Sequence, residues 1–153
     1  MLKERKENTS MTIYFDMDGT IADFYGVENW LNYLEAHDTT PYEIAKPLIH
    51  FSTLARMLNR LKREGYTLGI ISWCSRSGTP EYNDRTAEAK RNWLAKHLPS
   101  VQFDIIHIIP YGTPKNRYNK GNDILFDDEE RNRKAWTGRA YRQDEIFEVL
   151  KEL

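Results

Sequence analysis

Four short apolar runs, each bounded by polar or turn residues, dominate the hydrophobic pattern of the chain. They are TIYF at 12–15, TLGIIS at 67–72, FDIIHII at 103–109 and DILF at 123–126. Their lengths and their β-branched and aromatic content favour strands over helices. Because the hydrophobicity hardly alternates with polar positions, we predict parallel strands that are buried on both faces.

Helical periodicity separates these runs. Positions with helical spacing fall into three groups: Leu54, Met57, Leu58 and Leu61 before Gly65; Ala87, Lys90, Trp93, Leu94 and His97 before Pro99; and Ile146, Val149, Leu150 and Leu153 at the end of the chain. We expect Asp144 to cap the last helix. Strands that alternate with helices predict an α/β fold with a Rossmann-like parallel sheet, helices on both faces, and ligands bound at the carboxyl ends of the strands.

The stretch between Thr20 and Ser52 interrupts this alternation. It contains the helical pattern VENWLNYLEAHD, is rich in aromatic residues and has no strand pattern. We predict a small helical cap at about residues 24–50, inserted after the first strand and lying over the carboxyl edge of the sheet. Charged and polar residues fill most of positions 1–10 without periodicity, which predicts a flexible lead-in over residues 1–11 to a single domain spanning residues 12–153.

Composition narrows the classes of partner. The 153 residues include 22 Lys and Arg against 23 Asp and Glu, a formal charge of −1, so no overall field favours duplex nucleic acid or an acidic membrane. The single cysteine, Cys74, cannot form an internal disulfide, and the polar start has no signal-peptide pattern. No apolar run approaches the ~20 residues of a membrane span. We expect a cytoplasmic protein with a local site, and a homodimer remains open.

Polar side chains mark the ends of the four predicted strands. They are Asp16 and Asp18, then Ser72, then Lys115 in the loop PYGTPK, and finally Asp127 and Asp128. Crowded acids repel one another unless a cation neutralises them, and an all-oxygen set without His or Cys suits Mg²⁺. Because Mg²⁺ commonly binds through carboxylates together with phosphate oxygens, we expect a phosphorylated ligand.

These motifs resemble those of a known family. DMDGT after a strand, a serine that closes the second strand, a lysine before the fourth and ILFDD at its end resemble, in order and spacing, the four motifs of the haloacid dehalogenase superfamily of phosphohydrolases. The resemblance runs from about Thr12 to the end of the chain. Within the superfamily, DFYG, AKRNWLAKHLP and DILFDDEERN are similar to the 5'(3')-deoxyribonucleotidase group and its phage and bacterial relatives.

The resemblance implies a role for each acid of the first motif. Asp16 is the nucleophile that becomes an aspartyl phosphate, and Asp18 protonates the leaving oxygen and later deprotonates the hydrolytic water. Residues i and i+2 of an extended chain share a face, which would let both carboxylates reach one phosphorus. Gly19 then allows a sharp turn, so this glycine belongs to the expected substrate site.

The resemblance also assigns the remaining strand ends. Ser72 hydrogen-bonds a phosphoryl oxygen, Lys115 neutralises charge on the nucleophile and on the transferring group, and Asp127 and Asp128 hold Mg²⁺ together with the two acids of the first motif. Lys120 lies closer to ILFDD and is an alternative to Lys115. The residues leave open which of the last two acids binds the metal directly.

Aromatic residues supply the candidate contacts to the rest of a substrate. We expect Phe24, Tyr25 and Trp30 of the cap and Trp73 after the second strand to line the entrance. The aromatic residues of the cap, Trp30, Tyr33 and Tyr42 among them, fit stacking on a nucleobase and fit a small core of the cap equally well.

The sequence therefore predicts a Mg²⁺-dependent phosphomonoesterase that acts on a small phosphorylated metabolite, in the first place a nucleoside monophosphate. A polynucleotide 3'-phosphatase and a general small-molecule phosphatase are alternatives with the same chemistry. A receiver-like, phospho-accepting signalling domain is an alternative of another class. Receivers carry an acidic pair after the first strand and the phosphorylated aspartate after a later one, whereas here the Asp-x-Asp comes first and the acidic pair last.

Overall fold

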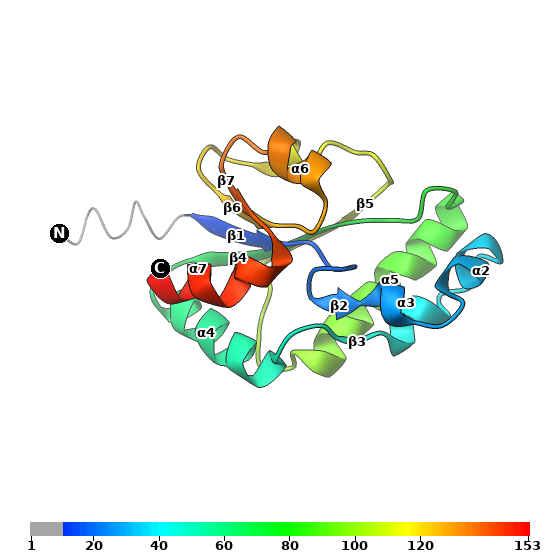
Figure 1. Ribbon diagram of the computed structural model, residues 1–153, viewed down its shortest axis with the longest axis horizontal. Helices are drawn as coiled ribbons and strands as arrows, with labels where there is room; N and C mark the ends of the chain where they lie inside the picture. The colour runs from blue at the N-terminus through cyan, green and yellow to red at the C-terminus, as the bar shows by residue number, and fades with distance from the viewer. Residues whose placement is uncertain (1–10) are drawn as a thin grey trace.

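A five-stranded parallel sheet forms the centre of the computed structural model, which describes residues 11–153. The strand order is β5-β4-β1-β6-β7 (Figure 1), with β1 at Thr12–Phe15, β4 at Thr67–Trp73, β5 at Ile105–Ile109, β6 at Ile124–Phe126 and β7 at Arg139–Tyr141. This confirms the predicted α/β fold and its parallel sheet. Residues 1–10 of the expected lead-in lie outside the described residues, and the carbonyl of Met11 already accepts a hydrogen bond from the amide of Thr67 (3.1 Å).

The two edge strands differ from the prediction. β7 was missed because its sequence, RAY, is short and begins with the exposed Arg139, so it has no strand pattern. It pairs with β6 in parallel, with Ile124 opposite Arg139. β5 was expected to be buried on both faces, but most of it is only half-buried, since an edge strand has a single neighbour.

Three helices cover one face of the sheet: α4 (Phe51–Arg63), α5 (Pro80–His97) and α7 (Ile146–Glu152). They bury Leu58, Trp93 and Leu150 against apolar side chains of β1, β4 and β6. Each such side chain contributes about 1.5–3 kcal/mol when it is fully buried. Figure 1 shows α4 and α7 together on this side of the sheet, with α6 on the opposite side.

The opposite face has a thinner cover. It consists of the 3₁₀ turn η2 (Lys115–Tyr118) and the short helix α6 (Glu130–Ala135), around a small core that includes Tyr14 and Trp136. Because η2 and α6 follow β5 and β6, this cover also brings the residues after those strands to the carboxyl edge of the sheet.

The predicted cap of the last helix is wrong. The 3₁₀ turn η3 (Gln143–Glu145) precedes α7, and the carboxylate of Asp144 accepts hydrogen bonds from the guanidinium of Arg142 instead of from the start of the helix. The sequence predicts correctly that a helical segment begins near Asp144. The guanidinium of Arg142, however, binds the carboxylate oxygens that a helix cap would use.

A small insert follows β1, as predicted. It contains η1 (Phe24–Gly26), α2 (Trp30–Glu35) and α3 (Thr40–Ile44), and it is closed by a two-stranded antiparallel ribbon of β2 (Ala22–Asp23) and β3 (Lys46–Pro47). We expected no strand there, and two residues a side are too few to produce a pattern. Phe24 and Tyr42 pack with Tyr82 of α5 in a separate core, which fastens the insert to that helix.

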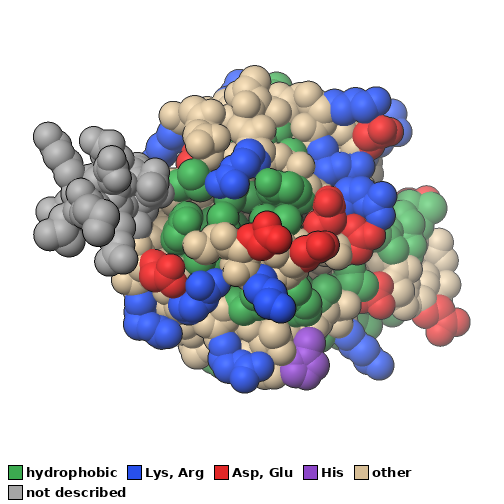
Figure 2. All heavy atoms as spheres, turned by 60° about the vertical axis from the view of Figure 1, so that its left-hand side comes forward, with side chains coloured by type: hydrophobic (Ala, Val, Ile, Leu, Met, Phe, Trp, Pro, Cys, Tyr) green, Lys and Arg blue, Asp and Glu red, His purple; other side chains and the backbone are tan. Residues whose placement is uncertain are grey.

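The surface carries mixed charge, in keeping with the near-neutral composition. Figure 2 shows basic and acidic side chains interspersed with hydrophobic ones over one face of the molecule. Within residues 11–153, no helix combines the length and the apolar character needed to cross a membrane.

Candidate active site

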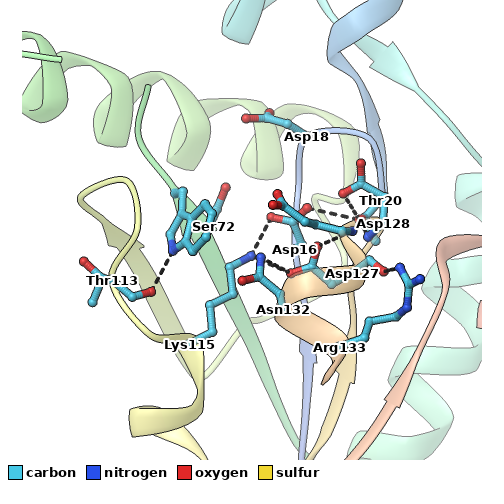
Figure 3. A network of polar contacts seen from close by, with 12 residues as sticks. Asp16, Asp18, Thr20, Ser72, Thr113, Lys115, Asp127, Asp128, Asn132 and Arg133 are labelled. Atoms are coloured by element: carbon cyan, nitrogen blue, oxygen red, sulfur yellow. Dashed lines mark hydrogen bonds and ion pairs between the residues drawn. The ribbon is translucent and has the colours of Figure 1, made fainter. Parts of the chain in front are cut away.

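Three carboxylates meet at the carboxyl edge of the sheet. One oxygen each of Asp16, Asp127 and Asp128 lies within 4.8 Å of the others (Figure 3). The amide of Asp16 donates to the carbonyl of Phe126 (2.9 Å), so the ladder between β1 and β6 extends far enough to fix the first acid beside the other two. The parallel α/β fold thus builds a largely buried aspartate triad that fits a metal ion.

Lys115 lies between two of these acids. Its Nζ donates to Asp16 Oδ1 (3.0 Å) and to Asp127 Oδ2 (2.8 Å), and its side chain is only 3% exposed. Burial would lower the pKa of Lys115, but the charges of Asp16 and Asp127 outweigh it and raise this pKa, so the ammonium stays charged. Lys120 is exposed, and its backbone amide binds the carboxylate of Asp123 instead. Of the two candidate lysines, Lys115 is the one at the acids.

Thr20 joins the first motif to the last and was not predicted. Its hydroxyl is fully buried, lies 3.1 Å from Asp16 Oδ2 and 3.3 Å from Asp128 Oδ1, and accepts from the amide of Asp128 (3.1 Å). The turn before it depends on Gly19, whose φ of +80° favours glycine and where a Cβ would overlap the carboxylate of Asp128. Gly19 therefore shapes the acidic cluster.

The acids of the last motif are held firmly. Asp127 accepts from the side-chain amide of Asn132 (3.1 Å) and from the backbone amide of Glu129 (2.9 Å). Burial, followed by repulsion from Asp16, raises the pKa of both Asp127 and Asp128. Three carboxylates with little room to separate, joined by no histidine or cysteine within residues 11–153, fit a hard divalent cation such as Mg²⁺.

Asp18 was predicted to be a metal ligand, but its carboxylate lies outside the triad. Figure 3 shows it apart from Asp16 and beside α5. Its Oδ2 accepts from Nζ of Lys90 (2.9 Å), a lysine in the middle of α5. Burial raises the pKa of Asp18, while the positive charge of Lys90 opposes that rise. The carboxylates of the two acids of DMDGT diverge, and both acids lie beyond Phe15, where β1 ends.

Ser72 also departs from its expected position. It is fully buried behind the cavity wall, where its Oγ accepts from Nζ of Lys90 (2.6 Å). Ser75, three residues later, does line the cavity, and within residues 11–153 its hydroxyl has no hydrogen-bond partner. Ser72 was predicted because it ends the apolar run of the second strand. The sequence pattern did not show that β4 continues to Trp73, or that the loop after Trp73 forms the cavity wall.

A cavity of about 320 Å³ opens over the acidic triad. Residues from the insert form its apolar wall: Phe24, Tyr25, Trp30, Leu31, Leu34 and Tyr42. Of the predicted entrance residues, Phe24 is buried, whereas Tyr25 is 54% exposed. Tyr33 points elsewhere and lines a different hollow. Phe24, Trp30 and Tyr42 thus contribute both to the core of the insert and to the cavity wall.

Trp73 forms the other side of the cavity. Its indole N–H donates to the carbonyl of Thr113 (2.8 Å), which fixes the loop that carries Lys115. The Lys115 ammonium lies 5.4 Å from the centre of the indole ring, and the guanidinium of Arg131 lies 4.9 Å from it. The cavity therefore has charged residues at its base and aromatic residues around its opening.

The chain matches no protein-family model, and none of the curated proteins compared with it matches either. Function is therefore inferred from the geometry of the site.

Proposed function

We propose that the protein is a Mg²⁺-dependent phosphomonoesterase of the haloacid dehalogenase type, acting through an aspartyl-phosphate intermediate. The observation that carries this proposal is the ammonium of Lys115 held between Asp16 and Asp127 beside a third acid, Asp128. A site that only binds a metal ion needs no more than the acidic residues. A lysine fixed against the same acids adds positive charge where a phosphoryl group would develop negative charge.

In the proposed reaction, a carboxylate oxygen of Asp16 attacks phosphorus and the bond from phosphorus to the ester oxygen breaks. Asp18 gives that oxygen its proton. Asp18 then takes a proton from water, whose oxygen attacks the phosphorus, and Asp16 is released with inorganic phosphate. Lys115 stabilises the charge on the transferring group in both steps. Mg²⁺, which the triad would hold, supplies charge neutralisation between the anionic substrate and the acids.

Strand order argues against the receiver-like alternative. Numbered along the chain, the five parallel strands run 3-2-1-4-5 across the sheet. Receiver domains have the flavodoxin-like order 2-1-3-4-5, in which the third strand lies beside the first. Here the strand beside β1 on that side is β6, which brings the closing acidic pair next to Asp16.

The cavity favours a substrate with an aromatic group next to its phosphate. Its floor is charged, and its walls carry Phe24 and Trp30 from the insert and Trp73 from the sheet. A nucleoside monophosphate combines these properties, and stacking tolerates any base. Because the insert is short and leaves Tyr25 half exposed, we expect weak discrimination between bases.

A substrate screen tests the proposal. The purified full chain would be assayed for phosphate release from 5'- and 3'-nucleoside monophosphates, ribose 5-phosphate, glycerol phosphate and 3'-phosphorylated oligonucleotides, with Mg²⁺ or with EDTA. We expect turnover of the mononucleotides that is lost in EDTA and restored by Mg²⁺. No release from any monoester would refute the proposal, and a preference for oligonucleotides would establish the polynucleotide phosphatase alternative.

Trp30→Ala tests the aromatic wall. Because stacking is worth about 1–3 kcal/mol per base, kcat/KM for deoxynucleoside monophosphates should fall roughly 5- to 150-fold, while that for ribose 5-phosphate should change little. Tyr33→Ala is a matched control, since it removes an aromatic ring from the same helix without touching the cavity. Equal losses on nucleotides and on ribose 5-phosphate would argue against base stacking.

A further inference from the structure

A lysine is buried where a helix faces the core. Lys90 is fully buried in α5, three residues before Trp93, which packs under the sheet. Its helical position is that of an apolar residue, which is why the sequence pattern counts it with the core face. A buried ammonium is costly unless its charge and its donors are satisfied, so the contacts of Lys90 need a reason.

The ammonium has a complete set of acceptors. Its Nζ lies 2.9 Å from Asp18 Oδ2, 2.6 Å from Ser72 Oγ and 2.9 Å from the carbonyl oxygen of Trp73. Three N–H groups meet three acceptors, and only one of these carries charge. The ring of Tyr42 closes the remaining side, with its centre 5.0 Å from Nζ. Lys90 therefore has one fixed position, which is tied to the end of β4.

This arrangement restrains one oxygen of Asp18 and leaves the other free. Oδ2 is bound to Lys90, whereas Oδ1 has no hydrogen-bond partner among the described residues, and Asp18 lines the cavity. A carboxylate on a turn can rotate about its side-chain bonds, and an acid or base must stay within hydrogen-bond reach of the atom it serves. Because Lys90 holds Oδ2, the other oxygen of Asp18, Oδ1, keeps a fixed direction.

We infer that Lys90 is a positioning residue that holds the carboxylate of Asp18 for proton transfer, with Ser72 fixing the ammonium from behind. The inference rests on the proposed phosphatase function. It gives Ser72, the buried residue before the last one of β4, a role in supporting Lys90, because its hydroxyl accepts a hydrogen bond from that lysine. Lys90 itself is outside the cavity wall and does not touch substrate.

The test uses the dependence of rate on the leaving group. Lys90→Met and Lys96→Met would be compared on p-nitrophenyl phosphate and on an alkyl phosphate such as glycerol phosphate, with saturating Mg²⁺. Lys96 is an exposed lysine of the same helix and serves as the matched control. Because general acid–base catalysis contributes about 10²- to 10⁴-fold and an aryl leaving group needs little of it, Lys90→Met should lower kcat at least about 10²-fold more on the alkyl substrate.

A double-mutant cycle separates positioning from a structural role. If Lys90 acts through Asp18, Lys90→Met combined with Asp18→Asn should be no slower on the alkyl substrate than Asp18→Asn alone, within about threefold. Losses that multiply, or equal losses on aryl and alkyl substrates, would overturn the inference while leaving the phosphatase function standing. A wild-type chain without monoesterase activity would instead overturn the proposed function, and the inference with it.

Ser72→Ala covers the case in which the lysine variants do not fold. It removes one acceptor from Lys90 but leaves the ammonium paired with Asp18, so the unfolding temperature should fall less than in Lys90→Met. Loss of one hydrogen bond to the ammonium should lower kcat on the alkyl phosphate about 3- to 10-fold and leave p-nitrophenyl phosphate almost unchanged. An unaltered ratio between the two substrates would refute the positioning role.

Discussion

Asp16→Asn should abolish turnover of every phosphate monoester while the chain stays folded. An amide is neither a competent nucleophile toward phosphorus nor a good ligand for Mg²⁺, so both functions proposed for Asp16 are lost together. The expected loss is on the order of 10⁴- to 10⁶-fold in kcat, as when the nucleophile of another covalent catalyst is removed. The measurement is release of p-nitrophenol at saturating substrate and Mg²⁺, with thermal unfolding recorded on the same samples.

The fold should survive because the contacts of Asp16 can be retained in part. Asn still accepts from Nζ of Lys115 through its carbonyl oxygen, and Lys115 keeps its ion pair with Asp127. Asp144→Asn, an exposed acid far along the chain, is the control and should behave as wild type. Rapid acid quenching of the wild type should trap phosphate on a peptide containing Asp16. Wild-type rates in Asp16→Asn would show that the mechanism is wrong.

The strands and their ends were predictable from the sequence because burial imposes a pattern. β1, β4, β5 and β6 are apolar runs, and parallel strands bring their carboxyl ends to one edge whatever the details of the loops. That rule alone brought Asp16, Lys115 and Asp127 together. By contrast, β7 and the ribbon of the insert are two or three residues long, with too few positions to form a period.

The direction of side chains at the site was not predictable in the same way. The spacing of Asp16 and Asp18 suggests one face only if the chain stays extended, but β1 ends at Phe15, and the second carboxylate lies against Lys90 of α5. Helical spacing places Lys90 at a position that usually holds an apolar residue. No feature of the neighbouring sequence indicates that its partner, Asp18, lies 72 residues earlier. Contacts of that kind follow from packing between elements, which hydrophobic patterning does not encode.

The acidic residues of the site are paired unequally with its two lysines. Within residues 11–153, Asp16 and Asp127 of the triad pair with one ammonium, that of Lys115, while Asp18 pairs with Lys90. Burial, followed by the negative charge of Asp16, raises the pKa of Asp128, and the excess negative charge of the triad favours a divalent cation. In the proposed reaction, the triad would hold the metal ion beside the phosphoryl group, and Asp18 would transfer protons.

Lys115→Ala should cost far more activity than Lys120→Ala. A charged donor directed at developing phosphoryl charge is worth on the order of 10²- to 10³-fold, by analogy with one oxyanion-hole donor. Lys115 lies against two acids of the triad, whereas Lys120 is exposed, and a surface lysine is nearly neutral in such a test. Initial rates on a nucleoside monophosphate and on p-nitrophenyl phosphate, compared between the two variants, measure the difference. The reverse ranking would assign the phosphoryl role to Lys120.

Removal of Lys115 should also change how the chain responds to Mg²⁺. Deleting one partner of a buried ion pair costs about 3–5 kcal/mol, because the remaining acids then repel one another without compensation. A divalent cation restores part of that balance, so the unfolding temperature of Lys115→Ala should rise more on addition of Mg²⁺ than that of wild type. Lys115→Arg keeps the charge and should recover stability, but its planar group cannot reproduce a point charge between two carboxylates, so activity should stay low. If Mg²⁺ raised the unfolding temperature of neither protein, the triad would not be the metal site.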